Sequence, residues 1–149
     1  MTSEKDLKKL LINSDIFIGT YSSEKLPTFP HIDSVPKAMI VNIVEEGGKS
    51  GHWVAILMTK LECLFFDSTG RKLKETNLIE YLSAHYDYVV FNPNRLQHVK
   101  SDKCGQFCAL FVMCVKNSCD FKKFVNSFFR CDLMKNDLVL QVYFENKMI

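Results

Sequence analysis

The chain of 149 residues is long enough for one domain with a sizeable core, and its 47% apolar content excludes a disordered protein. A net charge of +2 is too small to indicate nucleic-acid binding by itself. The sequence has neither an apolar signal-peptide stretch nor a run of about 18 apolar residues, so we expect a protein that is not secreted and does not span a membrane. Its six cysteines then indicate free thiols in a reducing compartment.

The N-terminal part of the chain is predicted to form a helix, a short apolar segment and a long loop. Residues 3–6 resemble a capped helix start, and the leucines at 7, 10 and 11 give one buried stripe that should end near Asn13. A short apolar run over residues 16–21 follows and ends at a turn. Prolines at 27, 30 and 36 then predict an irregular loop.

Three apolar runs in the middle of the chain predict an antiparallel meander. They cover residues 38–44, 52–58 and 63–67 and are rich in β-branched and aromatic side chains. The segments between them, including a glycine-rich turn at 47–51, are short enough for hairpins. We expect the meander to belong to a larger sheet that includes residues 88–91.

Four further patterns predict helices. Thr76 is the expected cap of a helix that buries Leu78, Ile79 and Leu82, and Asn136-Asp137 favours a helix over 138–144. The helix that starts at Cys104 is apolar on nearly all sides and should lie in the middle of the domain. Asp120 is expected to cap an amphipathic helix with one aromatic face: Phe121, Phe124, Val125, Phe128 and Phe129.

The sequence therefore predicts a single α+β domain over residues 1–149, with a central, mostly antiparallel sheet packed by helices. No internal repeat, low-complexity tract or linker divides it.

Cys104, followed directly by Gly105, is the candidate nucleophile. A cysteine at a helix N-terminus lies beside unpaired backbone N–H groups and the positive end of the helix dipole, which together favour a thiolate. Glycine has no Cβ and so allows a backbone or a substrate to come close. The alternative is a buried cysteine packed in a core helix.

His52 and Asp67 are the candidate base and its partner. Of the four histidines, only His52 opens an apolar strand, where it stands beside Trp53. Asp67 is the only acid at the end of an apolar strand, and antiparallel pairing of the two strands would bring the two side chains together. The alternatives are a surface histidine at a strand end and an aspartate that only serves the turn at 67–70.

Gln97 is the candidate side-chain donor for an oxyanion. A thiolate attacking a carbonyl needs such donors, and the backbone N–H groups at Cys104 and Gly105 would supply the rest. Gln97 stands seven residues upstream of Cys104, although a glutamine in a loop is more often simply solvated. With His52 and Asp67, these residues make a full set for a cysteine peptidase, with Trp53 either walling the cleft or packing in the core.

These motifs resemble the adenain family, the adenovirus-type maturation cysteine proteases. The resemblance covers roughly residues 1–116. The wider clan, which includes the SUMO-deconjugating proteases, shares the His-Trp and Gln…Cys-Gly elements. The segments that carry the resemblance are Phe17–Tyr21, Met39–Asn42, Gly51-His52-Trp53, Asp67, Gln97 and Cys104–Cys108.

Two details favour the adenain branch over the SUMO proteases. One is the second cysteine, Cys108, and the other is the seven-residue step from Gln97 to Cys104. The SUMO proteases usually carry an aspartate where this chain has Lys103.

The resemblance implies an adenain- or SUMO-protease-like fold with a buried nucleophile helix. It implies that Cys104 attacks, that His52 transfers the proton, that Asp67 fixes the imidazole and that Gln97 holds the oxyanion. Gly51, Trp53 and Gly105 would then bind substrate. The implied substrates are virion precursor proteins cut next to glycine, in the virion and the host nucleus or cytoplasm, and we expect a monomer.

The chain also departs from the adenovirus enzymes. Asp67 stands where they generally have glutamate, and the chain is shorter, chiefly after Cys114, which suggests a smaller DNA virus or a virus-like element. Those enzymes are stimulated by DNA and by a peptide disulfide-linked to a cysteine whose aligned position here is Tyr86. We therefore expect no disulfide-linked peptide and no cofactor or metal for the chemistry, while DNA or another peptide stays open as an activator.

Two other functions stay open. The nearer one is a SUMO- or ubiquitin-like deconjugating protease that acts on host proteins with the same chemistry. The other is a zinc-stapled binding module, which the lack of any Cys-x₂-Cys pair disfavours. Its ligands would be Cys104, Cys108, Cys114 and Cys119.

Overall fold

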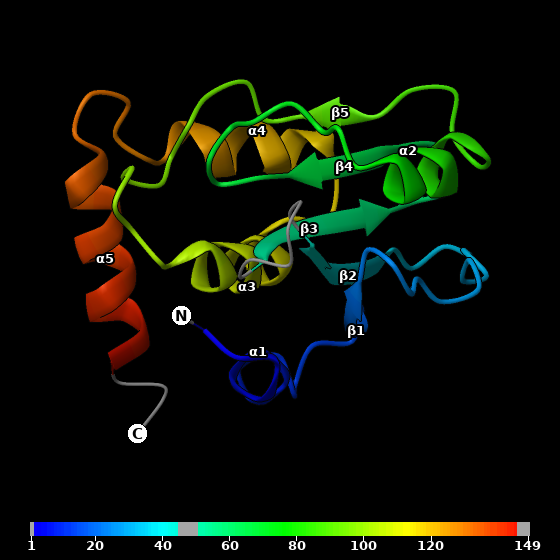
Figure 1. The fold of residues 1–149 in the computed structure, drawn as a ribbon, viewed down its shortest axis with the longest axis horizontal. Helices are drawn as coiled ribbons and strands as arrows, with labels where there is room; N and C mark the ends of the chain where they lie inside the picture. Colours follow the sequence, from blue (N-terminus) through cyan, green and yellow to red (C-terminus); the bar gives the residue numbers. More distant parts are fainter. Residues whose placement is uncertain (1, 45–50, 146–149) are drawn as a thin grey trace.

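A computed structural model of the chain describes residues 2–44 and 51–145. The predicted glycine-rich turn therefore lies outside the described residues, apart from Gly51. Figure 1 shows helices gathered around a central sheet, with α5 and α2 at opposite ends of the long axis. The elements are α1 (Glu4–Leu10), β1 (Phe17–Ser22), β2 (Lys37–Ile43), β3 (His52–Met58), β4 (Cys63–Phe66), α2 (Thr76–Ser83), β5 (Val90–Phe91), α3 (Cys104–Cys114), α4 (Ser118–Asn126) and α5 (Leu133–Glu145).

The described sheet has the strand order β1-β2-β3-β4-β5. The central pairs β2–β3 and β3–β4 are antiparallel, which confirms the predicted meander. The outer pairs β1–β2 and β4–β5 are parallel, so the sheet is mixed and the fold is α+β. Parallel neighbours need long connections, and here the proline-containing loop joins β1 to β2 while α2 lies between β4 and β5. The sequence pattern did not reveal these two parallel pairings.

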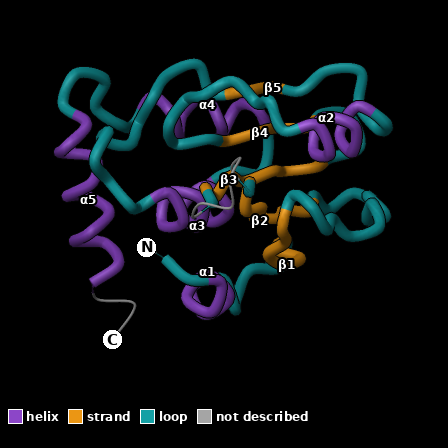
Figure 2. Tube along the Cα trace, in the orientation of Figure 1, coloured by secondary structure: helices purple, strands orange, loops and turns teal. Residues whose placement is uncertain are grey.

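Each face of the sheet contributes to a different core cluster. One cluster combines residues from β2, β3 and β4 with α1, α3, α4 and α5, and the other combines the opposite face with α2 and the proline-containing loop. Every residue of β3 is buried, because both faces of this strand are covered. Figure 2 shows the same arrangement, with helices around the strands and α3 close to β3.

Aromatic rings hold α3 and α4 against the sheet. The rings of Phe66 and Phe111 are stacked at a centroid distance of 5.2 Å, and Phe124 meets Phe66 edge-on at 5.4 Å. Such pairs add about 0.5–1.5 kcal/mol each to the burial of their area. This packing fixes α3, which is buried along most of its length as predicted, although Cys114 at its end is exposed.

Two helices are capped by residues other than those expected. Glu75, and not Thr76, caps α2, because its carboxylate accepts hydrogen bonds from the backbone N–H groups of residues 77 and 78. Ile79 of this helix is exposed and does not join the buried face. Asn117, and not Asp120, caps α4 and accepts from the Asp120 N–H at 2.8 Å.

The two helices at the C-terminal end also differ from the sequence pattern at their ends. The helix α4 ends at Asn126, so Phe128 and Phe129 follow it in irregular backbone. The helix α5 starts at Leu133, which places Asn136 inside the helix and not at its cap.

Asn136 is a fully buried polar residue that ties α5 to two loops. Its side-chain oxygen accepts from the Phe129 N–H at 2.8 Å, and its amide nitrogen donates to the carbonyls of Leu96 and Phe129 at 3.0 and 2.8 Å. The next residue, Asp137, accepts from the backbone N–H of His98 at 3.2 Å. The loop that carries residues 96–98 is therefore anchored on α5.

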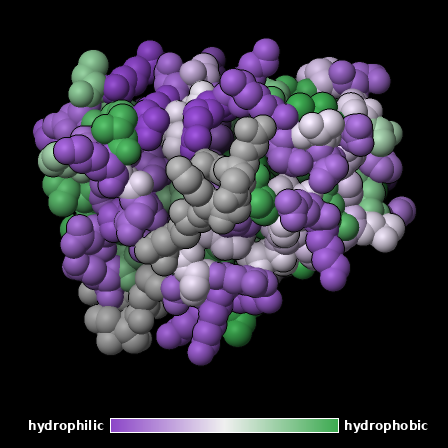
Figure 3. All heavy atoms as spheres, viewed as in Figure 1, coloured by the Kyte–Doolittle hydropathy of each residue, from purple (hydrophilic) through white to green (hydrophobic). Residues whose placement is uncertain are grey.

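No helix among the described residues is long and apolar enough to cross a membrane. The face of the molecule seen in Figure 3 is covered mainly by hydrophilic residues, with scattered apolar side chains between them.

We predict that Asn136→Ala lowers the free energy of unfolding by about 2–4 kcal/mol, because it removes the partner of one backbone donor and two carbonyls, among them the buried carbonyl of Leu96. Urea unfolding followed by circular dichroism measures this change. Asn77→Ala, on the exposed surface of α2, is the matched control and should change stability little. Equal stability of the two variants would contradict the anchoring role of Asn136.

Candidate active site

The strands β3 and β4 bring His52 and Asp67 together. His52 is the first residue of β3, and Asp67 directly follows the last residue of β4. Ala55 of β3 pairs with Phe66 of β4. If the same register continued by one more pair, Asp67 would lie diagonally across from His52. The distance from His52 Nε2 to Asp67 Oδ1 is 2.7 Å, and both residues are buried. The structure thus contains the adjacency that antiparallel pairing predicted.

Asp67 also shapes the turn that follows β4. The Gly70 N–H donates to the Asp67 carbonyl at 2.9 Å, and Gly70 has φ +66°, a left-handed conformation that favours glycine. A Cβ at Gly70 would lie 2.8 Å from the Arg95 nitrogen, so this position has no room for a side chain. The turn-forming role and the pairing with His52, considered above as alternatives, are both present.

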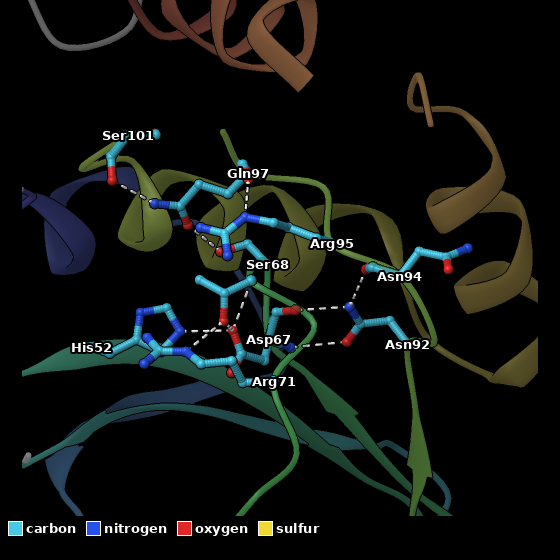
Figure 4. Close-up of polar contacts among 10 residues, drawn as sticks. His52, Asp67, Ser68, Arg71, Asn92, Asn94, Arg95, Gln97 and Ser101 are labelled. Atoms are coloured by element: carbon cyan, nitrogen blue, oxygen red, sulfur yellow. Dashed lines mark hydrogen bonds and ion pairs between the residues drawn. The ribbon is translucent and has the colours of Figure 1, made fainter. Parts of the chain in front are cut away.

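Three donors converge on one carboxylate oxygen of Asp67. Besides His52, the backbone N–H and the hydroxyl of Thr69 donate to Oδ1 at 2.8 and 2.6 Å. Arg71 Nε donates to the Thr69 hydroxyl oxygen at 3.0 Å, which leaves the hydroxyl proton for Asp67. Figure 4 shows the side chains of His52 and Asp67 pointing toward one another.

Asn92 holds the main chain of Asp67. Its side-chain oxygen accepts from the Asp67 N–H at 2.9 Å, and its amide nitrogen donates to the Asp67 carbonyl at 2.7 Å. The sequence pattern gave Asn92 no role, and it gave Thr69 none beyond the turn at 67–70. Their positions next to Asp67 become visible only in three dimensions.

The electrostatics of the pair favour an ionised state. Burial lowers the pKa of His52, but the hydrogen bonds to Asp67 and Cys104 and the charges of both partners outweigh it and raise the pKa to about 9. Burial raises the pKa of Asp67, yet the hydrogen bond and charge of His52 and the bonds from Thr69 bring it below its ordinary value. At neutral pH the site therefore holds an imidazolium beside a carboxylate.

The orientation of His52 follows from its partner. The ionised Asp67 can only accept, so Nε2 carries the proton of the bond between them. Nδ1 is then the imidazole nitrogen left for Cys104, whose thiol is near enough to His52 to raise the pKa of the imidazole. Cys104 is the first residue of α3 and is buried, and the N-cap residue Lys103 makes no side-chain capping bond.

Gln97 is buried and does not behave as a solvated loop residue. Its side-chain oxygen accepts from the Ser68 hydroxyl at 2.5 Å, and its amide nitrogen donates to the Ser101 carbonyl at 2.8 Å. Its backbone carbonyl accepts from Arg95 Nε at 2.6 Å. In Figure 4 the Gln97 amide lies between Ser68 and Ser101, three residues before Cys104 in the chain.

The three residues expected to bind substrate are all packed closely. A Cβ at Gly51 would overlap the side chain of Asn42. The Trp53 indole is buried and donates to the Thr2 carbonyl at 3.0 Å. A Cβ at Gly105 would lie 2.8 Å from Thr2 Cβ and 3.2 Å from Trp53 Cδ1. Packing alone thus accounts for both glycines, and the N-terminal segment covers the start of α3.

The cysteines of the alternative zinc module are not gathered in one place. Cys104 and Cys108 are buried, whereas Cys114 and Cys119 are exposed. Within residues 2–44 and 51–145, no group of three or more His, Cys, Asp or Glu side chains is arranged to hold a metal ion. Burial raises the pKa of Cys63 to about 12 and the pKa of Cys108 well above its ordinary range, so both thiols stay protonated.

Tyr86, at the position aligned with the adenovirus disulfide cysteine, is half-buried. Its hydroxyl donates to the Thr59 carbonyl at 2.7 Å, and burial raises its pKa.

No protein-family model matches the chain, and no curated protein matches it significantly. Among solved structures, the chain is similar to the selenomethionine crystal structure of ASFV pS273R protease, with a TM-score of 0.43 and 18% identity. The match covers 68% of this chain and 42% of that one, so the chain spans about two fifths of that protease's length.

We predict that Asp67→Asn lowers the pKa of His52 by about 1–3 pH units, because it removes the opposite charge that stabilises the imidazolium. A titration of the histidine resonances by NMR measures this shift. In the wild type, stabilisation by the pair is fully present below the free-imidazole value of 6.5 and is lost as the pH rises through about 9. In Asp67→Asn that loss should come at lower pH. An unchanged His52 titration would contradict the proposed electrostatic role of Asp67.

Proposed function

We propose that the protein is a cysteine endopeptidase with Cys104 as nucleophile and His52 as general acid and base. The observation that carries the proposal is the buried 2.7 Å bond between His52 and Asp67, together with the buried thiol at the start of α3, which raises the pKa of His52. A nucleophile, a base within hydrogen-bonding reach and a group that orients the base are the parts that covalent catalysis requires. The other polar contacts of the site fix this orientation.

The reaction follows from these positions. The Cys104 thiolate attacks the scissile carbonyl carbon, and the carbonyl π electrons move to oxygen and form an oxyanion. His52, as imidazolium, gives its proton to the leaving amine as the C–N bond breaks, which leaves a thioester. The neutral imidazole then takes a proton from water, whose oxygen attacks the thioester carbon. The C–S bond breaks, which releases a carboxylic acid and restores the Cys104 thiolate beside the His52 imidazolium.

Donors for the oxyanion are available at the N-terminus of α3. The first N–H groups of a helix have no partner within the helix, and the backbone N–H of Cys104 belongs to this group. The amide nitrogen of Gln97 carries two N–H groups, one of which goes to the Ser101 carbonyl. We assign the second N–H to the oxyanion.

The substrate assignment rests on the resemblance to the adenain family in the sequence motifs. We propose viral or virus-like precursor proteins, cut next to glycine during virion maturation, with Gly51, Trp53 and Gly105 along the substrate path. The proposed enzyme is a monomer that works in the virion and the host nucleus or cytoplasm. Its chemistry needs no cofactor, and Tyr86 leaves no thiol for a disulfide-linked peptide at that position. DNA or a non-covalent peptide would act as activator only.

Cleavage of a Gly-Gly-containing peptide library, followed by mass spectrometry, tests this function. The wild type should release products, and Cys104→Ala, purified in the same way, should release none. Ubiquitin-like fusion proteins in a parallel reaction separate the two substrate classes. Preferred cleavage of these folded fusions would favour a deconjugating protease, and equal product from wild type and Cys104→Ala would refute the peptidase assignment.

We predict that Gln97→Ala folds normally and lowers kcat by about 10²–10³-fold, the usual effect of removing one oxyanion donor. Steady-state kinetics on the best peptide of the library measures this change. Gln141→Ala, which removes a glutamine exposed on α5, is the matched control and should turn over as the wild type does. A rate for Gln97→Ala close to that of the control would remove Gln97 from the site.

A further inference from the structure

Ser68 is a fully buried residue between Asp67 and Thr69, and the mechanism above gives it no role. Its hydroxyl lies 2.5 Å from Gln97 Oε1. Its backbone carbonyl accepts from the N–H groups of Leu96 and Gln97 at 2.8 and 2.9 Å. Ser68 therefore makes three hydrogen bonds to the loop that carries Gln97.

The direction of these bonds fixes which way the Gln97 amide points. The Ser101 carbonyl can only accept, so the nitrogen of the amide must face it. The amide oxygen then faces Ser68, and the Ser68 hydroxyl must donate to it. Two hydrogen-bond partners on opposite sides of the amide therefore fix the terminal side-chain torsion of Gln97, χ3, which otherwise has a broad distribution.

The backbone of the loop has supports that do not depend on the Ser68 hydroxyl. The Ser68 carbonyl holds the N–H groups of Leu96 and Gln97, and Asn136 and Asp137 of α5 hold residues 96 and 98 from the other side. Removing only the hydroxyl should therefore leave the loop in place and free the Gln97 side chain. The orientation of the Gln97 amide can therefore be changed without changing the fold of the loop.

We propose that Ser68 is a positioning residue that orients the Gln97 side-chain amide toward the oxyanion. The inference rests on the proposed peptidase function and deepens it. It means that one turn positions two catalytic groups. Asp67 orients the base through its carboxylate, and Ser68 orients the oxyanion donor through its hydroxyl. A displacement of the turn would then disturb the base and the oxyanion donor together.

Ser68→Ala tests the proposal by separating two reactions of the same thiol. Peptide hydrolysis needs the oxyanion donor, whereas alkylation of Cys104 by iodoacetamide forms no oxyanion and needs only the thiolate. We expect kcat for hydrolysis to fall by about 10–10²-fold with KM little changed, because a misaimed donor loses much of its effect. The alkylation rate of Cys104 should stay at the wild-type value, since His52 and Asp67 are untouched.

Thr69→Val is the matched control in the same turn. It removes the neighbouring hydroxyl, which donates to Asp67 and not to Gln97, and should lower alkylation and hydrolysis together. Ser68→Ala added to Gln97→Ala should cause no further loss of kcat, because both changes remove the same interaction. Ser127→Ala, at the end of α4, controls for the loss of a serine hydroxyl elsewhere.

A readout without catalysis completes the test. In the NMR spectrum of the wild type, the Gln97 side-chain amide should give two separate, slowly exchanging N–H signals, and Ser68→Ala should make them exchange quickly.

Unchanged signals, or normal hydrolysis by Ser68→Ala while Gln97→Ala is impaired, would overturn the inference and leave the peptidase function standing. A parallel fall in alkylation would mean that Ser68 acts through Asp67 and would also overturn it. A wild type that alkylates at Cys104 but hydrolyses nothing would refute the peptidase function instead.

Discussion

The buried ion pair of His52 and Asp67 is the constraint on which the rest of the site depends. Two charges that leave water are costly unless each finds partners, and a 2.7 Å bond between them satisfies only one atom of each. Asp67 Oδ1 also accepts from the backbone N–H and the hydroxyl of Thr69, and the second nitrogen of the imidazole is left to Cys104. The pair therefore needs a turn of fixed shape after β4 and a helix start opposite β3.

The surrounding structure supplies both requirements through buried polar contacts. Asn92 fixes the main chain of Asp67 on one side, and Ser68 ties the same turn to the loop of Gln97 on the other. That loop is anchored in turn on α5 by Asn136, while the phenylalanine cluster holds α3 against the sheet. A site built this way is preorganised, because its donors are oriented before any substrate binds.

Sequence could predict the parts of this arrangement that depend on a local hydrophobic pattern or on the pairing of two consecutive strands. The register of two adjacent strands placed Asp67 near His52, and an all-round apolar segment placed α3 in the core. The parallel pairing of β1 with β2 and of β4 with β5 could not be predicted, because the sequence of a strand does not show which strand lies beside it. Asn92, Asn136 and Ser68 resemble ordinary turn and cap residues, and only burial together with partners far away in sequence reveals their roles.

The central claim is that His52 activates Cys104, and brief iodoacetamide labelling of the native protein at about pH 6 tests it most directly. Peptide mapping reports all six cysteines at once. The account predicts that Cys104 is labelled first in the wild type, ahead of the exposed Cys114, Cys119 and Cys131, and that His52→Ala loses this preference. If another cysteine reacts first, or if Cys104 reacts equally fast in His52→Ala, the pairing of imidazole and thiol described here is wrong.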